Sequence, residues 1–145
     1  MVEQDGGAPL GADAGNEAQG TPSPRGSRKR RVAALEQYKD DPTGFVEGVL
    51  GGAGEPYGKQ REFLELAATH RRVSVVGCNG SGKDWTAARI VLWWIETRPK
   101  AKAVVTGPTQ RQVEEVVWRE MRVAYAMAGK ALRGKMYASR YVVDD

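Results

Sequence analysis

The sequence has few of the residues that build disulfide-linked, metal-rich or membrane-spanning proteins. Its 145 residues include one cysteine, Cys78, and one histidine, His70. A single cysteine excludes an internal disulfide and is typical of a reducing compartment. So few histidines and cysteines leave no cluster with the spacing of metal ligands. His70 ends a predicted helix, where a cation is favoured, and this position accounts for it without a functional role.

Long apolar runs are also missing. The longest, residues 90–95, has six residues, whereas a membrane span needs about 20. The first 20 residues carry four acidic residues and no apolar stretch, so we expect no signal peptide. The formal net charge of +4 permits a nucleic-acid partner without requiring one. We therefore expect a soluble, intracellular protein of one domain with no membrane partner.

The N-terminal segment 1–31 lacks the apolar residues of a core. It holds six glycines and three prolines, and its only large apolar residues are Met1, Val2 and Leu10. Burial of so few cannot offset the entropy of ordering, so we predict a disordered tail over 1–31, followed by a domain over 32–145. The basic run 28–31 has two interpretations, contact with DNA phosphates or a solvated linker.

From residue 32 the pattern alternates between helical and strand periods. Helices are predicted over 32–38, from the Asp41-Pro42 start, over 45–50, 59–70, 84–97 and 110–127. Strands are predicted over 72–77, 102–106 and 136–143. This order favours an α/β fold with a right-handed parallel sheet and flanking helices. The four tryptophans lie in or beside the predicted helices, where we expect core packing more than base stacking.

The turn between the first predicted strand and its helix carries the chemistry. It consists of Gly77, Cys78, Asn79, Gly80, Ser81, Gly82, Lys83 and Asp84. This spacing fits the phosphate-binding loop G-x-x-x-x-G-K, also called Walker A, except at its last position. Glycines let several backbone N–H groups point inward toward phosphates, and the lysine adds a positive charge. The alternative without phosphate binding is a glycine-rich connection with an exposed lysine.

Asp84 stands where this loop usually has a Ser or Thr that binds Mg²⁺. A carboxylate can also bind Mg²⁺, and its charge is favoured at a helix N-terminus. The same charge beside a triphosphate weakens binding unless the metal lies between them. We therefore expect ATP and Mg²⁺ as cofactors, with Asp84 as the candidate metal ligand, and expect nucleotide binding more than efficient hydrolysis.

Four segments in order resemble the large terminase subunit of tailed bacteriophages, the ATPase that packages DNA. They are 56–64, the loop with its flanks over 75–85, the tryptophan pair 93–94, and 104–113. The resemblance extends from about residue 38 to residue 145. It implies a P-loop NTPase sheet, here incomplete, that hydrolyses ATP to move double-stranded DNA into procapsids.

The resemblance also implies roles for single residues and partners. Gln60 would bind the adenine edge and Tyr57 would stack on the base, although a helix start and a surface aromatic explain them as well. Thr106, Gly107, Thr109 and Gln110 would belong to a coupling segment, which links the nucleotide state to DNA movement. A strand-ending turn with a helix cap explains Gly107, Pro108 and Thr109 equally well. Relatives form a homo-oligomeric ring on the portal, work with a small terminase subunit, and act in the host cytoplasm.

The hydrolytic half of such a motor is not evident in the sequence. Relatives need an acidic residue after a later strand and an adjacent glutamate. Asp144 and Asp145 follow a predicted strand, but the second acid is not glutamate and the resemblance places this motif further downstream. The catalytic residues thus stay unknown, no nuclease acid cluster is evident, and we expect an N-terminal fragment of a longer ATPase and nuclease with negligible turnover.

Two alternatives remain. One is another P-loop ATPase of helicase type; the segment 106–112 disfavours a small-molecule kinase but not a helicase. The other is a non-catalytic remnant that binds DNA through the basic residues of 25–31 and 111–140, with affinity that falls steeply with salt.

Overall fold

The computed structural model describes residues 24–51 and 55–143, and side chains from residue 30 onward. These residues form mainly helices. The helices are α1 Pro24–Glu36, α2 Pro42–Gly48, α3 Gly58–Thr69, α4 Lys83–Thr97, α5 Gln110–Val113, the π-helix η1 Glu114–Trp118, α6 Arg119–Ala128 and the 3-10 turn η2 Gly129–Ala131. The strands β1 Lys135–Met136 and β2 Tyr141–Val142 form an antiparallel hairpin.

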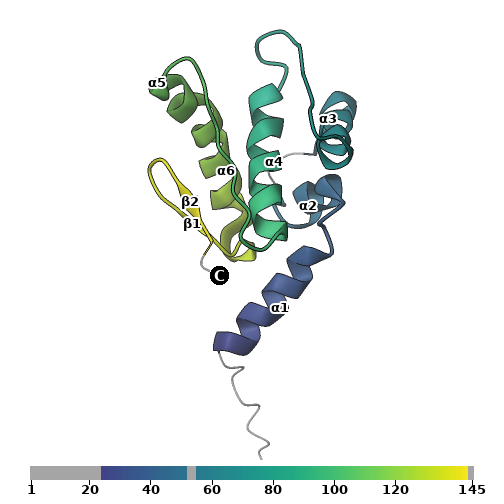
Figure 1. The fold of residues 1–145 in the computed structure, drawn as a ribbon, viewed down its shortest axis with the longest axis vertical. Coiled ribbons are helices and arrows are strands. Elements are labelled where there is room, and N and C mark those ends of the chain that lie inside the picture. Colours follow the sequence, from purple (N-terminus) through teal and green to yellow (C-terminus); the bar gives the residue numbers. More distant parts are fainter. Residues whose placement is uncertain (1–23, 52–54, 144–145) are drawn as a thin grey trace, which may run out of the picture.

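Helix α4 is the central element of the described fold. In Figure 1 it lies between α2 and α3 on one side and α6 with the hairpin on the other, while α1 extends from the base. Its apolar face explains this position, because Ala88, Leu92 and Trp93 are fully buried. Phe45 from α2 and Met121 from α6 join the same core. The Trp93 Nε1 also donates to the Tyr38 carbonyl at 2.7 Å, so burial costs this indole no unpaired donor.

The caps predicted from the sequence are confirmed. The Asp41 carboxylate accepts from Gly44 N at 2.7 Å at the start of α2, with Pro42 as its first residue. Thr109 Oγ1 accepts from Gln112 N at 3.2 Å at the start of α5. The run from α5 through α6 then ends at Gly129, whose φ is 55°. Each N-cap side chain accepts from a backbone N–H three residues later, and Gly129 acts through its own φ, so the local sequence is sufficient.

The sheet differs from the predicted one. Residues 72–77 and 102–106 are extended stretches in Figure 1, and neither is assigned as a strand. A strand is defined by hydrogen bonding to a neighbour, and within the described residues these two stretches have no strand beside them to pair with. The predicted strand 136–143 is the β1–β2 hairpin instead. The only pairing among the described residues is thus antiparallel, and the parallel P-loop sheet remains a prediction.

The structure describes only part of the predicted tail, and it shows how the four tryptophans pack. Residues 1–23 lie outside the described residues, and the expected boundary at residue 32 falls within α1. Trp93 is fully buried, and Trp85 and Trp118 pack against the core, whereas Trp94 is 39% exposed. Core packing is therefore confirmed for three of the four. None of the described helices combines the length and the apolar character that a bilayer span requires.

Candidate phosphate-binding site

The glycine-rich loop directly precedes α4, as its sequence predicts. Gly80 and Gly82 have φ of 76° and 75°, a left-handed conformation in which a side chain is strained. Gly82 is the N-cap of α4, and Lys83 is its first residue. The loop therefore ends where the positive end of the helix dipole begins, which is the arrangement that favours a bound phosphate.

Lys83 folds back over the loop rather than into solvent. Its Nζ donates to the Gly77 carbonyl at 2.8 Å, to the Cys78 carbonyl at 2.6 Å and to Ser81 Oγ at 3.1 Å. All three acceptors are oxygens, and a phosphate offers oxygens of the same kind with more negative charge. The ammonium thus lies inside the curve of the loop, in the position from which it can neutralise a phosphate.

Tyr57 and Gln60, predicted to recognise a base, both reach the loop from the start of α3. The Tyr57 hydroxyl donates to the Ser81 carbonyl at 2.6 Å, and the Tyr57 side chain is about half exposed. Gln60 Oε1 accepts from Tyr57 N at 3.2 Å. A Cβ on Gly82 would overlap Gln60 Nε2, so the amide end of Gln60 packs against the loop backbone. The structure brings all the predicted base and phosphate residues into one place.

Two cavities lie on either side of the loop. The first, about 430 Å³, is lined by Tyr57, Gln60, Phe63, Val75 and Lys83 among others. It combines apolar walls with a few polar groups, which suits a flat base next to a charged tail. The second, about 510 Å³, lies between the loop residues 79–84 and the segment 106–117. One side of the loop is therefore mainly apolar, and the other faces the predicted coupling segment.

The predicted coupling residues divide into two groups. Thr106 and Gly107 line the second cavity, together with Gln112 of α5, which the sequence reasoning did not select. Gln112 could have been found from its place one turn after Gly107-Pro108. Thr109 and Gln110 are not among the residues that line it: Thr109 Oγ1 caps α5, and Gln110 Nε2 donates to Glu114 Oε1 at 2.7 Å. The helix cap explains Thr109 and the bond to Glu114 explains Gln110 without a role in coupling.

The structure gives less support to the predicted Mg²⁺ ligand and does not test the predicted acidic residues. Asp84 is exposed and lines the second cavity beside the loop. Across the described part of the chain, no group of three His, Cys, Asp or Glu side chains converges as metal ligands do. Asp84 as a Mg²⁺ ligand therefore stays a prediction. Asp144 and Asp145 lie outside the described residues.

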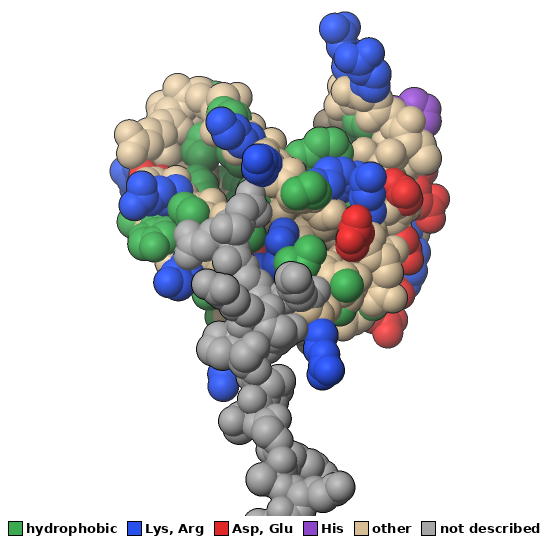
Figure 2. Space-filling model, turned by 60° about the horizontal axis from the view of Figure 1, so that its bottom comes forward, with side chains coloured by type: hydrophobic (Ala, Val, Ile, Leu, Met, Phe, Trp, Pro, Cys, Tyr) green, Lys and Arg blue, Asp and Glu red, His purple; other side chains and the backbone are tan. Residues whose placement is uncertain are grey.

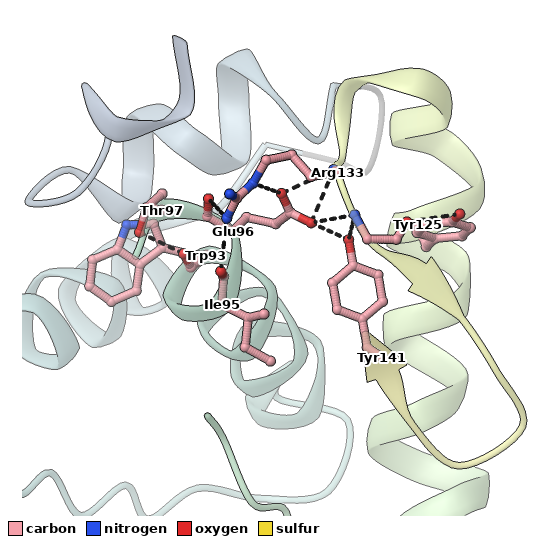
Figure 3. Close-up of polar contacts among 8 residues, drawn as sticks. Trp93, Ile95, Glu96, Thr97, Tyr125, Arg133 and Tyr141 are labelled. Atoms are coloured by element: carbon pink, nitrogen blue, oxygen red, sulfur yellow. Dashed lines mark hydrogen bonds and ion pairs between the residues drawn. The ribbon is translucent and has the colours of Figure 1, made fainter. Parts of the chain in front are cut away.

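A buried polar cluster occupies the opposite end of α4, and sequence reasoning missed it. Figure 3 shows Glu96 facing the hairpin, where its carboxylate accepts from Arg133 Nε at 3.2 Å and from Gly134 N at 3.0 Å. The Tyr141 hydroxyl also donates to Glu96. Burial, and next the charge of Glu96, raise the pKa of Tyr141 well above its ordinary value of 10.0. Partners 37 to 45 residues apart leave no local signal in a sequence.

Basic side chains do not form one stripe on the face drawn in Figure 2. Where the chain is described, Lys and Arg lie there in several separate groups, and acidic side chains gather on one side. A continuous basic track along this face would have favoured contact with a nucleic-acid backbone. This face therefore adds no support to the DNA-binding alternative.

Comparisons of the chain with models of known protein families, with curated proteins and with solved structures found no match.

Proposed function

We propose that this chain is a nucleotide-binding unit of the P-loop type that binds ATP with Mg²⁺. The observation that carries the proposal is the position of Lys83, whose ammonium lies within a loop that two left-handed glycines shape. The β- and γ-phosphates would replace the oxygen acceptors that Lys83 now contacts. Backbone N–H groups at the start of α4 would complete the phosphate contacts.

The two cavities indicate where the base and the metal would bind. Adenine would enter the cavity lined by Tyr57 and Gln60, where Gln60 Nε2 is the available donor because Oε1 already accepts from Tyr57 N. Mg²⁺ would lie on the other side, between the phosphates and Asp84. A carboxylate suits Mg²⁺, and the metal would shield its charge from the triphosphate.

The proposal extends to the fold. We infer that the extended stretches 72–77 and 102–106 are strands of the predicted parallel sheet, and that further strands cover their open edges. Val76 is 97% exposed and Val104 is 86% exposed, although both lie in apolar, β-branched runs. Such runs are typical of strands that are covered on both faces, so their exposure indicates that more chain packs against these stretches.

The wider role rests on the resemblance of the four ordered segments. We propose a place in a terminase large subunit that packages double-stranded DNA into procapsids, with a ring at the portal, a small subunit and the host cytoplasm as its setting. For this chain we expect weak nucleotide binding and negligible hydrolysis, because no motif in the sequence identifies a catalytic glutamate. A helicase-like ATPase is the alternative within the same site.

Binding of a fluorescent ATP analogue with Mg²⁺ tests the site directly. Wild type should bind saturably, and Lys83→Ala should weaken binding by more than about tenfold, since it removes the charge at the phosphates. The matched control is Lys130→Ala, which changes an exposed lysine of η2 far from the loop in sequence. Absence of binding by folded wild type, or equal binding by Lys83→Ala, would contradict the proposal.

ATP hydrolysis by the same proteins tests the expectation of negligible turnover. Turnover by wild type that Lys83→Ala abolishes would show that this chain carries its own hydrolytic residues. DNA affinity that falls steeply with salt but ignores ATP and Lys83→Ala would instead favour the DNA-binding remnant.

A further inference from the structure

Tyr57 contacts the phosphate loop through its hydroxyl, not only through its ring. The hydroxyl donates to the Ser81 carbonyl at 2.6 Å, a bond across 24 residues of sequence. Ser81 lies between Gly80 and Gly82, the two residues of the loop with left-handed φ. The bond therefore attaches the left-handed part of the loop backbone to the N-cap residue of α3.

The start of α3 is itself held in place. Gln60 Oε1 accepts from Tyr57 N at 3.2 Å, which fixes the backbone of Tyr57 against its own helix. Gln60 then packs against Gly82 at the other side of Ser81. Within the loop, the Ser81 amide bonds only loosely to the Cys78 carbonyl, at 3.4 Å. The side chains of Tyr57 and Gln60 thus add to bonds within the loop and α4, in which Lys83 Nζ donates to Ser81 Oγ at 3.1 Å and Thr86 N donates to the Gly82 carbonyl at 3.0 Å.

We propose that Tyr57 is a positioning residue that holds the Ser81 carbonyl, and with it the N–H groups of residues 80–82, in the conformation that receives phosphates. This inference rests on the proposed function of the loop and assigns Tyr57 a role that does not depend on the base. A ring that only stacks on adenine would act on base-containing ligands alone. A hydroxyl that shapes the loop acts on every triphosphate equally.

Tyr57→Phe separates these roles because it removes the hydroxyl and keeps the ring. Binding of the fluorescent ATP analogue, of GTP by competition and of inorganic tripolyphosphate by competition would be compared with wild type. We expect all three to weaken by the same factor, about two- to tenfold, the usual effect of one hydrogen bond. Tyr137→Phe is the matched control, since Tyr137 is a 45% exposed tyrosine between the hairpin strands.

A second measurement needs no ligand. The ¹⁵N relaxation order parameters of the Ser81 and Gly82 amides should fall in Tyr57→Phe, from about 0.85, the value of rigid backbone, toward the flexible range below about 0.6. Those of α6 should not change, which distinguishes loop release from general loosening. Tyr57→Leu should show the same loss of order, because it also lacks the hydroxyl.

The outcomes are distinct. Unchanged order parameters in Tyr57→Phe would overturn the inference, whatever the ligands do. Weaker binding of ATP with unchanged binding of tripolyphosphate would also overturn it and would assign the ring to base stacking. If wild type binds no triphosphate while the order parameters fall as expected, the positioning contact stands and the proposed nucleotide function fails.

Discussion

The two ends of α4, a helix of 15 residues, place charged side chains in opposite surroundings. At its N-terminal end, a solvent-accessible loop with left-handed glycines surrounds the Lys83 ammonium. At its C-terminal end, Glu96 is fully buried and accepts hydrogen bonds from Arg133, Gly134 and Tyr141. The first end leaves charge available to a ligand, while the second uses charge to hold the hairpin. Changes at the two ends should therefore affect different properties.

The largest expected effect is on stability, at Glu96. Glu96→Ala leaves the largely buried Arg133, whose side chain is 12% exposed, and two further donors without their carboxylate, so we expect a loss of about 3–5 kcal/mol in the free energy of unfolding. Urea unfolding measures this. Glu96→Gln keeps the shape and should lose less, which provides a folded variant if Glu96→Ala does not fold. The control is the exposed Glu65→Gln, and equal losses in control and variant would contradict the comparison.

A smaller effect is expected at the glycines of the loop. Gly80→Ala meets only backbone strain, because no atom lies within 4 Å of the added Cβ. Gly82→Ala meets the same strain plus overlap with Gln60 Nε2. We expect about 1 kcal/mol for Gly80→Ala and about 1 kcal/mol more for Gly82→Ala by thermal unfolding. Adding Gln60→Ala should reduce the cost of Gly82→Ala alone; no such relief would show that the overlap is unimportant.

The pH dependence of stability provides a third comparison, at Tyr141. Its pKa in the folded state is raised above the ordinary value of 10.0, first by burial and then by Glu96. The folded protein therefore keeps this proton where the unfolded chain loses it. The contribution is complete below pH 10 and is lost above it, by roughly 1.4 kcal/mol per pH unit.

Urea unfolding of wild type and Tyr141→Phe at about pH 9 and about pH 11 tests this sign. Wild type should lose stability relative to Tyr141→Phe between the two values, since phenylalanine cannot ionise. Tyr137→Phe, at an exposed position, should show no such change relative to wild type. A constant difference between wild type and Tyr141→Phe would mean that Tyr141 ionises normally in the folded protein.

The smallest expected effect is the stability of Lys83→Ala. Its three acceptors lie beside solvent and can bond to water when the ammonium is removed. We expect the free energy of unfolding to change by about 0.5 kcal/mol or less, although nucleotide binding should weaken by more than about tenfold. A large loss of stability would show that the N-terminal end of α4 also holds the fold together, and the contrast between the two ends would disappear.

Local sequence predicted several helices and their caps, although α1 begins at Pro24, within the segment predicted as a disordered tail. Asp41-Pro42, Thr109 and Gly129 mark helix ends through bonds or dihedrals within a few residues, and the structure confirms each. Strands were predicted at 72–77 and 102–106; both stretches are extended, but among the described residues neither pairs with a neighbour. Pairing needs a partner elsewhere in space, and periodicity along one segment contains no information about that partner.

The sequence by itself determined the glycine-rich loop before α4, because glycine spacing, the lysine and the following helix are all local. Tertiary structure alone decided three further features. It joined Tyr57 to Ser81, collected the partners of Glu96 from positions 133–141, and left Val76 and Val104 exposed. The physical reason is range: a cap or tight turn forms among neighbours, whereas a buried carboxylate is stable only after distant donors have packed around it.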